Sequence, residues 1–292
     1  MKMLVFLMLV TRATVSLAQA NLNDVAADLA VPATTAEAPA AGQRVRATTP
    51  GWEATEVHHA LYLPTDWQPG KKFPVIVEYA GNGGYANKLG DTSDGSVEGC
   101  MLGYGLSAGH GYIWVCMPYV EINAGQKRNA SKWWGDVAET KKYCQATVQE
   151  ICTRFNGDAG RVVLMGFSRG AIACNYLGLH DDEIAGLWCG FLCHSHYEGE
   201  FKHPAADQTS WPERLKRLGN RPQFISQEMS TQATQAVIAG SGIKGNFTFI
   251  TLPYPNHSAR WALCDLPIRR AAREWLQKVT EGGVDPHKDT SR

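Results

Sequence analysis

The stretch Gly166-Phe167-Ser168-Arg169-Gly170 lies between two segments of different character. Residues 161–165 (RVVLM) form a short apolar run rich in branched side chains, as a buried strand requires. The pattern of residues 171–177 (AIACNYL) predicts a helix. In a strand, Gly-x-Ser-x-Gly, helix arrangement, the serine occupies a sharp turn at the end of a sheet with its hydroxyl exposed. Ser168 is therefore the candidate nucleophile.

Apolar strand-like runs alternate with helix-like segments through the rest of the chain. Strands are predicted at 56–63, 73–79, 112–117, 161–165, 184–193, 223–227 and 246–252. Helices are predicted after Trp134, with apolar residues at helical spacing as far as Phe155, and at 171–177, 231–239 and 267–280. This alternation predicts an α/β fold with a mostly parallel central sheet and helices on both faces. A chain of 292 residues is long enough for one such domain with a substantial core.

The N-terminus has the pattern of an export signal. Lys2 precedes a short apolar run at 3–10, and Ala18-Gln19-Ala20 supplies a small-x-small cleavage site. We therefore expect a signal peptide at 1–20 and a secreted or periplasmic protein. Residues 21–50 are rich in Ala, Thr and Pro, which predicts a flexible leader. The catalytic domain is expected at 51–281, followed by a polar tail at 282–292.

Composition limits the classes of partner and cofactor. The 28 acidic and 28 basic side chains balance, so the sequence indicates neither nucleic acid nor a stable association with a membrane. The apolar run at 3–10 is too short to span a bilayer. Eight cysteines in an exported chain favour one or two disulfides. Their spacing fits no zinc site, and no metal or cofactor is expected.

A serine hydroxyl needs a base, an acid that orients this base, and donors for the developing oxyanion. His257 is the candidate base, because it follows the last predicted strand and precedes the final helix. The Gly-rich run 80–84 follows an early strand, and flexible glycines there would let backbone amides converge on one oxygen. We predict the amides of Asn82 and Arg169 as the oxyanion donors.

The order of these elements resembles that of the α/β-hydrolase superfamily over about residues 55–280. More narrowly, the chain is similar to secreted bacterial esterases of the dienelactone hydrolase, acetyl xylan and feruloyl esterase and polyester depolymerase type. Arg169 directly after the serine also resembles glucuronoyl esterases, although the rest of their pattern is not evident. The resemblance implies a catalytic triad in the order Ser, acid, His, which Ser168 and His257 match.

The acid does not follow the family pattern cleanly. The family usually carries an Asp a few residues past the penultimate strand, where this chain reads Ser226-Gln227-Glu228-Met229-Ser230-Thr231. Glu228 is the carboxylate in that stretch, and its longer side chain could reach an imidazole. Some relatives place the acid after the preceding strand, which would favour Glu198 or Asp207. A chain with no acid, which binds without turnover, is the remaining alternative.

Two further histidines follow the strand predicted at 184–193. His194 and His196 are two residues apart and would face the same side, so we predict that they contact substrate. The main hypothesis is a secreted esterase acting on small-molecule or polysaccharide-linked esters. A peptidase of the prolyl-oligopeptidase kind and a non-catalytic binding protein on the same scaffold are the alternatives.

Overall fold

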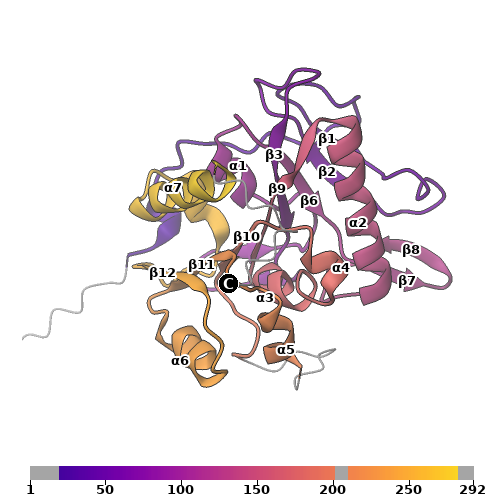
Figure 1. Cartoon of the computed structure of the whole chain (residues 1–292). Coiled ribbons are helices and arrows are strands. Elements are labelled where there is room, and N and C mark those ends of the chain that lie inside the picture. The colour runs from indigo at the N-terminus through magenta and orange to yellow at the C-terminus, as the bar shows by residue number, and fades with distance from the viewer. Residues whose placement is uncertain (1–19, 201–209, 282–292) are drawn as a thin grey trace, which may run out of the picture.

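The computed structural model describes residues 20–200 and 210–281. Most of the expected signal peptide, the alternative acid Asp207 and the expected polar tail lie outside these ranges. The described chain is built around one large sheet with helices packed on both of its faces (Figure 1). The α/β architecture expected from the sequence is therefore confirmed.

The central sheet has eight strands in the order β1-β2-β6-β3-β9-β10-β11-β12. β1 pairs antiparallel with β2, and β2 pairs antiparallel with β6. All remaining neighbours are parallel, so the carboxyl ends of these strands meet at one edge. The strands are β1 (Arg44–Ala47), β2 (His59–Tyr62), β3 (Phe73–Tyr79), β6 (Ile113–Met117), β9 (Gly157–Phe167), β10 (Gly190–His194), β11 (Pro222–Glu228) and β12 (Asn246–Leu252).

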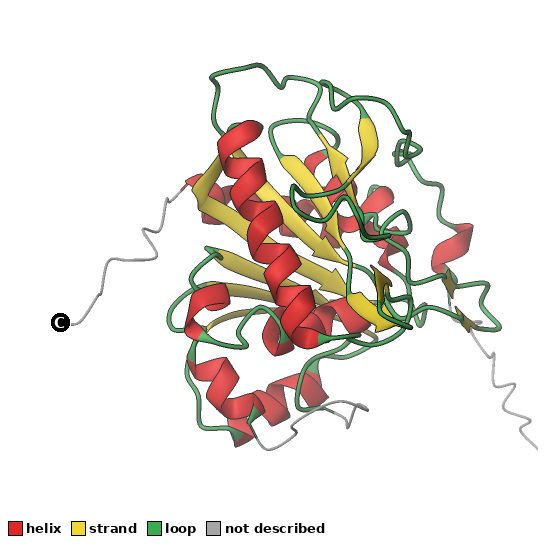
Figure 2. Cartoon of the chain, turned by 90° about the vertical axis from the view of Figure 1, so that its right-hand side faces the viewer, coloured by secondary structure: helices red, strands yellow, loops and turns green. Residues whose placement is uncertain are grey.

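Helices cover both faces of this sheet, as two perpendicular views show (Figures 1 and 2). One buried cluster joins the sheet to α2 and α3, and a second joins the opposite face to α1 and α7. Along β3 the side chains alternate between the two clusters, with Val75 and Val77 in the first and Ile76 in the second. The α-helices are α1 (Leu102–Ser107), α2 (Val137–Arg154), α3 (Arg169–Tyr176), α4 (Asp182–Ala185), α5 (Trp211–Lys216), α6 (Gln232–Gly240) and α7 (Pro267–Glu281).

The remaining elements are short and lie outside the central sheet. Two 3-10 helices are η1 (Leu22–Asp24) and η2 (Ala259–Leu263). Two small hairpins pair β4 (Tyr85–Ala86) with β5 (Thr92–Ser93) and β7 (Val120–Asn123) with β8 (Gln126–Asn129). The sequence 184–193 was expected to be one strand, but its start forms part of α4 and β10 begins at Gly190.

The structure corrects the prediction of a flexible leader at 21–50. This segment contributes η1 and the first strand of the central sheet, and its residue Ala27 forms a bridge with Cys264. The composition does not predict this order because a few individual side chains hold the segment against the rest of the chain. Leu22 and Val45 are fully buried, and Arg44 is 3% exposed. An Ala- and Pro-rich segment can be ordered by such anchors even without a periodic apolar pattern.

The expected disulfides are also absent. All eight cysteines, each within the described ranges, are free thiols, and seven of them are buried. Cys144 and Cys174 lie on helices that face the sheet, and Cys116 and Cys193 lie on strands within it. These thiols fill the core as small apolar side chains do.

Candidate active site

Ser168 occupies a strained turn between β9 and α3. Its φ of 55° and ψ of −116° lie outside the regions that L-residues ordinarily populate, and such backbone conformations gather at functional sites. The turn is held by a hydrogen bond from the Ser168 amide to the carbonyl of His194, at 2.9 Å. Ser168 is 7% exposed and lines a cavity at the carboxyl edge of the sheet.

The glycines on either side of Ser168 are required by close backbone contacts. A Cβ on Gly166 would lie 2.2 Å from the main chain of Gly170. A Cβ on Gly170 would lie 2.0 Å from the carbonyl oxygen of Tyr79 on β3. Any side chain at these positions would push the helix away from the sheet. The Gly-x-Ser-x-Gly pattern is therefore explained by one contact across the turn and one between the turn and β3.

His257 and Glu228 complete a chain of hydrogen bonds that begins at Ser168. His257 Nε2 lies 2.9 Å from Ser168 Oγ, and His257 Nδ1 lies 3.1 Å from Glu228 Oε1. Glu228 is the last residue of β11, and His257 lies in the loop after β12. The additional methylene of glutamate lets a carboxylate at the end of β11 reach the imidazole of His257. The sequence alone left open which carboxylate is the acid.

Ser195 is a member of this group that sequence reasoning missed. Its hydroxyl donates to Glu228 Oε1 and lies 2.7 Å from His257 Nδ1. Ser195 has a φ of 80°, a second strained residue at the site. It stands between His194 and His196, so the interest of that stretch was visible in the sequence, but the contact with Glu228 depends on the pairing of β10 with β11.

The electrostatic environment keeps Glu228 ionised. Burial alone would raise the pKa of its carboxyl, but the hydrogen bonds from His257 and Ser195 and the nearby imidazoles outweigh this and lower the pKa to about 2. A carboxylate that stays charged at neutral pH can hold Nδ1–H of His257 and leave Nε2 free to accept the proton of Ser168. Proton transfer from Ser168 to His257 is therefore supported by both the geometry and the charge.

The cavity over Ser168 has a volume of about 440 Å³. Its walls combine aromatic and aliphatic side chains with a few polar groups, as ligand sites commonly do. The lining residues are Asn82, Gly83, Gly84, Tyr85, Ser93, Lys132, Trp133, Phe167, Ser168, Arg169, Ile172, His196 and His257.

Two amides in the cavity wall fit the role of oxyanion donors. Arg169 is the first residue of α3, so its amide cannot bond within the helix. Asn82 follows β3, and its side-chain oxygen accepts from the amide of Trp133 at 2.8 Å. Among the described residues, neither the Arg169 amide nor the Asn82 amide has a hydrogen-bond acceptor. By contrast, the amide of Gly83 donates to Ser131 and is not available.

The side chain of Arg169 holds the loops around the cavity together. It is 1% exposed, and its guanidinium donates to the carbonyls of Trp133 and Gly81, both at 2.8 Å, and of Gly95 at 3.2 Å. The guanidinium also lies 3.9 Å from the ring centroid of Tyr119. These contacts give Arg169 a structural role beside the one predicted for its amide.

The two histidines predicted to contact substrate have different positions. His196 lines the cavity, and its ring centroid is 4.8 Å from that of His257. His194 has no exposed surface, and its ring nitrogens contact Ser226 Oγ at 2.9 Å and the carbonyl of Ser258 at 3.1 Å. Direct substrate contact by His194 is thus ruled out by burial. Burial also lowers the pKa of both imidazoles to about 4, so both are neutral at pH 7.

The alternative acid Glu198 is engaged elsewhere. Its carboxylate receives hydrogen bonds from Arg214 at 2.9 and 2.5 Å, and both side chains are buried. A buried carboxylate that is paired with an arginine in this way cannot leave its partner without a large energetic cost. Glu228 is therefore the carboxylate that the structure brings to His257.

A second cavity of about 590 Å³ adjoins the first, and the two share Gly84, Ser93 and Phe167. Its polar lining residues include Thr92, Ser93, Asp94, Ser96 and Ser258.

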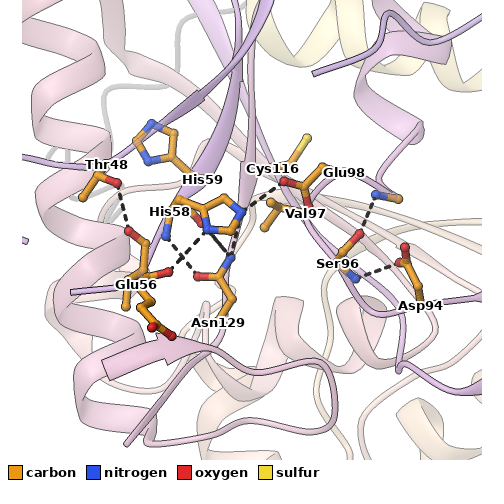
Figure 3. A network of polar contacts seen from close by, with 12 residues as sticks. Thr48, Glu56, His58, His59, Asp94, Ser96, Val97, Glu98, Cys116 and Asn129 are labelled. Atoms are coloured by element: carbon orange, nitrogen blue, oxygen red, sulfur yellow. Dashed lines mark hydrogen bonds and ion pairs between the residues drawn. The ribbon is translucent and has the colours of Figure 1, made fainter. Parts of the chain in front are cut away.

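The outer loop of this second cavity is fixed to His58, the residue that precedes β2. His58 Nε2 lies 3.0 Å from Glu98 Oε1. This contact is next to the turn in which the Ser96 amide donates to Asp94 (Figure 3). The main chain of His58 is in turn held by Asn129.

Neither a metal nor a membrane-spanning segment is indicated within the described ranges. No cluster of three or more His, Cys, Asp or Glu side chains there could hold a metal ion. No helix there has the length and apolar character needed to cross a bilayer.

Solved structures with a similar fold include esterases and a peptidase. Thermogutta terrifontis esterase 2, phosphorylated by paraoxon, is 11% identical with a TM-score of 0.52, covering 81% of this chain and 94% of its own. An esterase from the fungus Rhizomucor miehei is 12% identical with a TM-score of 0.50, covering 82% and 84%. The fold is that of the α/β-hydrolases.

A peptidase shares the same fold over part of its length. Porphyromonas gingivalis dipeptidyl peptidase 4 is 14% identical with a TM-score of 0.50, covering 80% of this chain but 35% of the peptidase. No protein-family model and no curated protein sequence matches the chain. At identities of 11–14%, these likenesses show a shared fold and not a shared reaction.

Proposed function

We propose that this protein is an exported serine hydrolase that cleaves carboxylic esters. The observation that carries the proposal is the hydrogen-bonded series Ser168, His257, Glu228 beside a cavity lined by Asn82 and Arg169, whose amides have no hydrogen-bond acceptor among the described residues. These are the parts that acyl transfer needs: a nucleophile, an oriented base and donors for the oxyanion. The pattern of residues 1–20 supports export.

In this mechanism Ser168 Oγ attacks the ester carbonyl carbon while His257 Nε2 takes the hydroxyl proton. The carbonyl oxygen becomes an oxyanion and accepts hydrogen bonds from the amides of Arg169 and Asn82. Collapse of this intermediate expels the alcohol, which receives its proton from His257, and leaves an acyl group on Ser168. Water then attacks the acyl group by the same steps and releases the acid. Glu228 holds the imidazole throughout and stabilises its charged form.

The adjoining cavity supports a polar alcohol part in the substrate. A short acyl group fits within the cavity of about 440 Å³ over Ser168. The cavity of about 590 Å³ beside it, whose lining includes residues with hydroxyl and carboxyl groups, offers room for a polyhydroxylated group. We therefore place sugar-linked esters, including those of polysaccharides, among the substrates of this enzyme. Acylated monosaccharides should be hydrolysed with a higher kcat/KM than alkyl esters of the same acid.

Hydrolysis of 4-nitrophenyl acetate and reaction with a fluorophosphonate probe test the proposal. Ser168→Ala should abolish labelling and reduce hydrolysis by several orders of magnitude, whereas Ser131→Ala, which removes an exposed hydroxyl outside the cavity, should change neither. Ester hydrolysis that survives Ser168→Ala would refute the mechanism. Cleavage of dipeptidyl amides in preference to esters would favour a peptidase, and absence of labelling in the folded wild type would favour a binding protein.

A further inference from the structure

The start of the described chain contacts the loop that carries His257. In η1, the amide of Leu22 donates to Asn256 Oδ1 at 2.7 Å, and the Leu22 side chain is fully buried. Asn21 Oδ1 accepts from Asn256 Nδ2 at 2.8 Å. Asn256 immediately precedes His257 in the sequence. A segment more than 230 residues away along the chain thus packs directly beside the candidate base.

Asp91 joins this segment to the same loop. Its Oδ1 accepts from Asn23 Nδ2 at 3.0 Å and from Asn256 Nδ2 at 2.8 Å. Its Oδ2 accepts from Asn87 Nδ2 at 2.8 Å and from the backbone amide of His257 at 3.0 Å. Asp91 is 3% exposed, and it meets these four donors with two oxygens.

Asn256 has every polar atom of its side chain bonded. It accepts from the Leu22 amide through Oδ1 and donates through Nδ2 to Asn21 and Asp91. Asn256 has no exposed surface, so removing any of these partners would leave its buried Oδ1 or one N–H group of its Nδ2 unpaired. This requirement allows few arrangements of the chain at 256–257 and therefore defines the path of the backbone there.

The His257 backbone needs such support because it lies outside regular structure. β12 ends at Leu252 and η2 begins at Ala259, so the intervening loop has no ladder or helix of its own to fix it. The imidazole must keep Nε2 within hydrogen-bond distance of Ser168, and displacements of about 1 Å at a reacting group can cost roughly a hundredfold in rate. Asp91 bonds to the amide of the base residue itself.

We propose that residues 21–23, Asp91 and Asn256 form a brace that holds His257 in position for proton transfer with Ser168. Asp91 is a positioning residue in this brace, because it acts through His257 and not on the substrate. The inference rests on the proposed function, since it assigns a role in the same reaction. The brace begins directly after the cleavage site expected at Ala20, so a chain processed there retains it, whereas removal of three further residues would destroy it.

The test compares Asp91→Asn and Asn23→Ala with two controls in the full-length chain. Asp24→Ala changes an exposed neighbour in η1. Asp28→Ala removes another anchor of the same segment, the pair with Arg269 at 2.6 and 2.7 Å, which does not contact His257. The quantities to compare are kcat and KM on 4-nitrophenyl acetate, the fluorophosphonate labelling rate, the melting temperature, and the downfield NMR resonance of the His257 Nδ1 proton.

Asp91→Asn replaces one accepting oxygen by an amide that opposes its donors. We expect kcat to fall at least tenfold with KM within twofold, together with a shifted or lost downfield resonance. Asn23→Ala should reduce kcat by a smaller factor. Asp28→Ala should lower the melting temperature with little change in kcat, and Asp24→Ala should change neither quantity.

Two results would overturn the brace. One is a wild-type kcat and an unchanged resonance in folded Asp91→Asn. The other is an equal loss of kcat in Asp28→Ala, which would make the effect one of general stability. A wild-type chain that neither labels nor hydrolyses would refute the proposed function instead, and the NMR resonance would still decide whether Asp91 positions His257.

Discussion

Replacing Glu228 by Gln removes the charge beside His257 while it preserves the shape of the side chain. The amide oxygen of Gln can still accept from His257 Nδ1 and from Ser195, so the hydrogen-bonded geometry survives. What is lost is the attraction between the carboxylate and the imidazolium that forms when Ser168 gives up its proton. The substitution therefore measures the electrostatic part of the role proposed for Glu228.

Two estimates from the structure bracket the size of this effect. The pKa of Glu228 is lowered from its ordinary 4.5 to about 2, which corresponds to about 3 kcal/mol in favour of the charged form. Two unit charges separated by 3.1 Å, the distance from His257 Nδ1 to Glu228 Oε1, attract by about 5 kcal/mol at an effective dielectric constant of about 20. A loss of about 3 to 5 kcal/mol in the transition state would lower kcat by roughly 10² to 10⁴.

The assay is the steady-state hydrolysis of 4-nitrophenyl acetate at pH 7.5, with Glu198→Gln as the matched control. Glu198 is also a buried carboxylate, but its partner is Arg214, so its substitution should lower the melting temperature and leave kcat within a few-fold. Full activity in Glu228→Gln would show that this carboxylate is not the acid. A large loss of kcat in Glu198→Gln at an unchanged melting temperature would move the acid to Glu198.

Three further results are expected. Ser195→Ala should lower kcat about tenfold with KM nearly unchanged, because Glu228 loses a hydrogen-bond donor; unchanged kinetics would refute this role. Gly170→Ala should yield little folded protein, because its Cβ would lie 2.0 Å from a carbonyl oxygen of β3, and normal melting would contradict this. Burial lowers the pKa of His59 to about 3 and of His194 and His196 to about 4, so the unfolded chain binds more protons below pH 6.5. The free energy of unfolding should therefore keep its full value above pH 6.5 and fall toward pH 4, by up to about 2 kcal/mol per histidine at pH 5. Equal midpoints of urea unfolding at pH 7.5 and pH 5 would contradict this.

The sequence predicted those features that depend on local patterns and on strand order. Branched apolar runs mark β3, β6 and β9. The glycines around Ser168 belong to a five-residue motif that can be recognised in the sequence, although the contact of Gly170 with Tyr79 on β3 cannot. The positions of Ser168 and His257 followed because the ends of parallel strands meet at one edge. Glu228 stood at the end of a predicted strand, and its reach to His257 depends on the pairing of β11 with β12.

Features that depend on long-range contacts between polar side chains could not be predicted in this way. The sequence 21–50 has neither a helical nor a strand period, and its order comes from anchors such as Leu22 and Arg44. Arg44 donates to the carbonyls of Val97 and Glu98, more than 50 residues away. Nothing local distinguishes an arginine with such partners from a solvated one, and the composition of the segment therefore indicated flexibility where the structure has order.

The segment 21–50, which the sequence predicted to be flexible, is also linked to the candidate active site. Arg44 supports the loop at 97–98, and Asn23 reaches Asp91 in the adjoining part of that loop. Asp91 then bonds to the amide of His257, whose ring contacts Ser168. Each of these contacts is between buried or half-buried groups. Loosening the N-terminal segment should therefore displace His257 before the sheet itself unfolds. Truncation through Asn23 should therefore reduce fluorophosphonate labelling of Ser168 at temperatures where circular dichroism still shows a folded chain, whereas truncation after Ala20 should not.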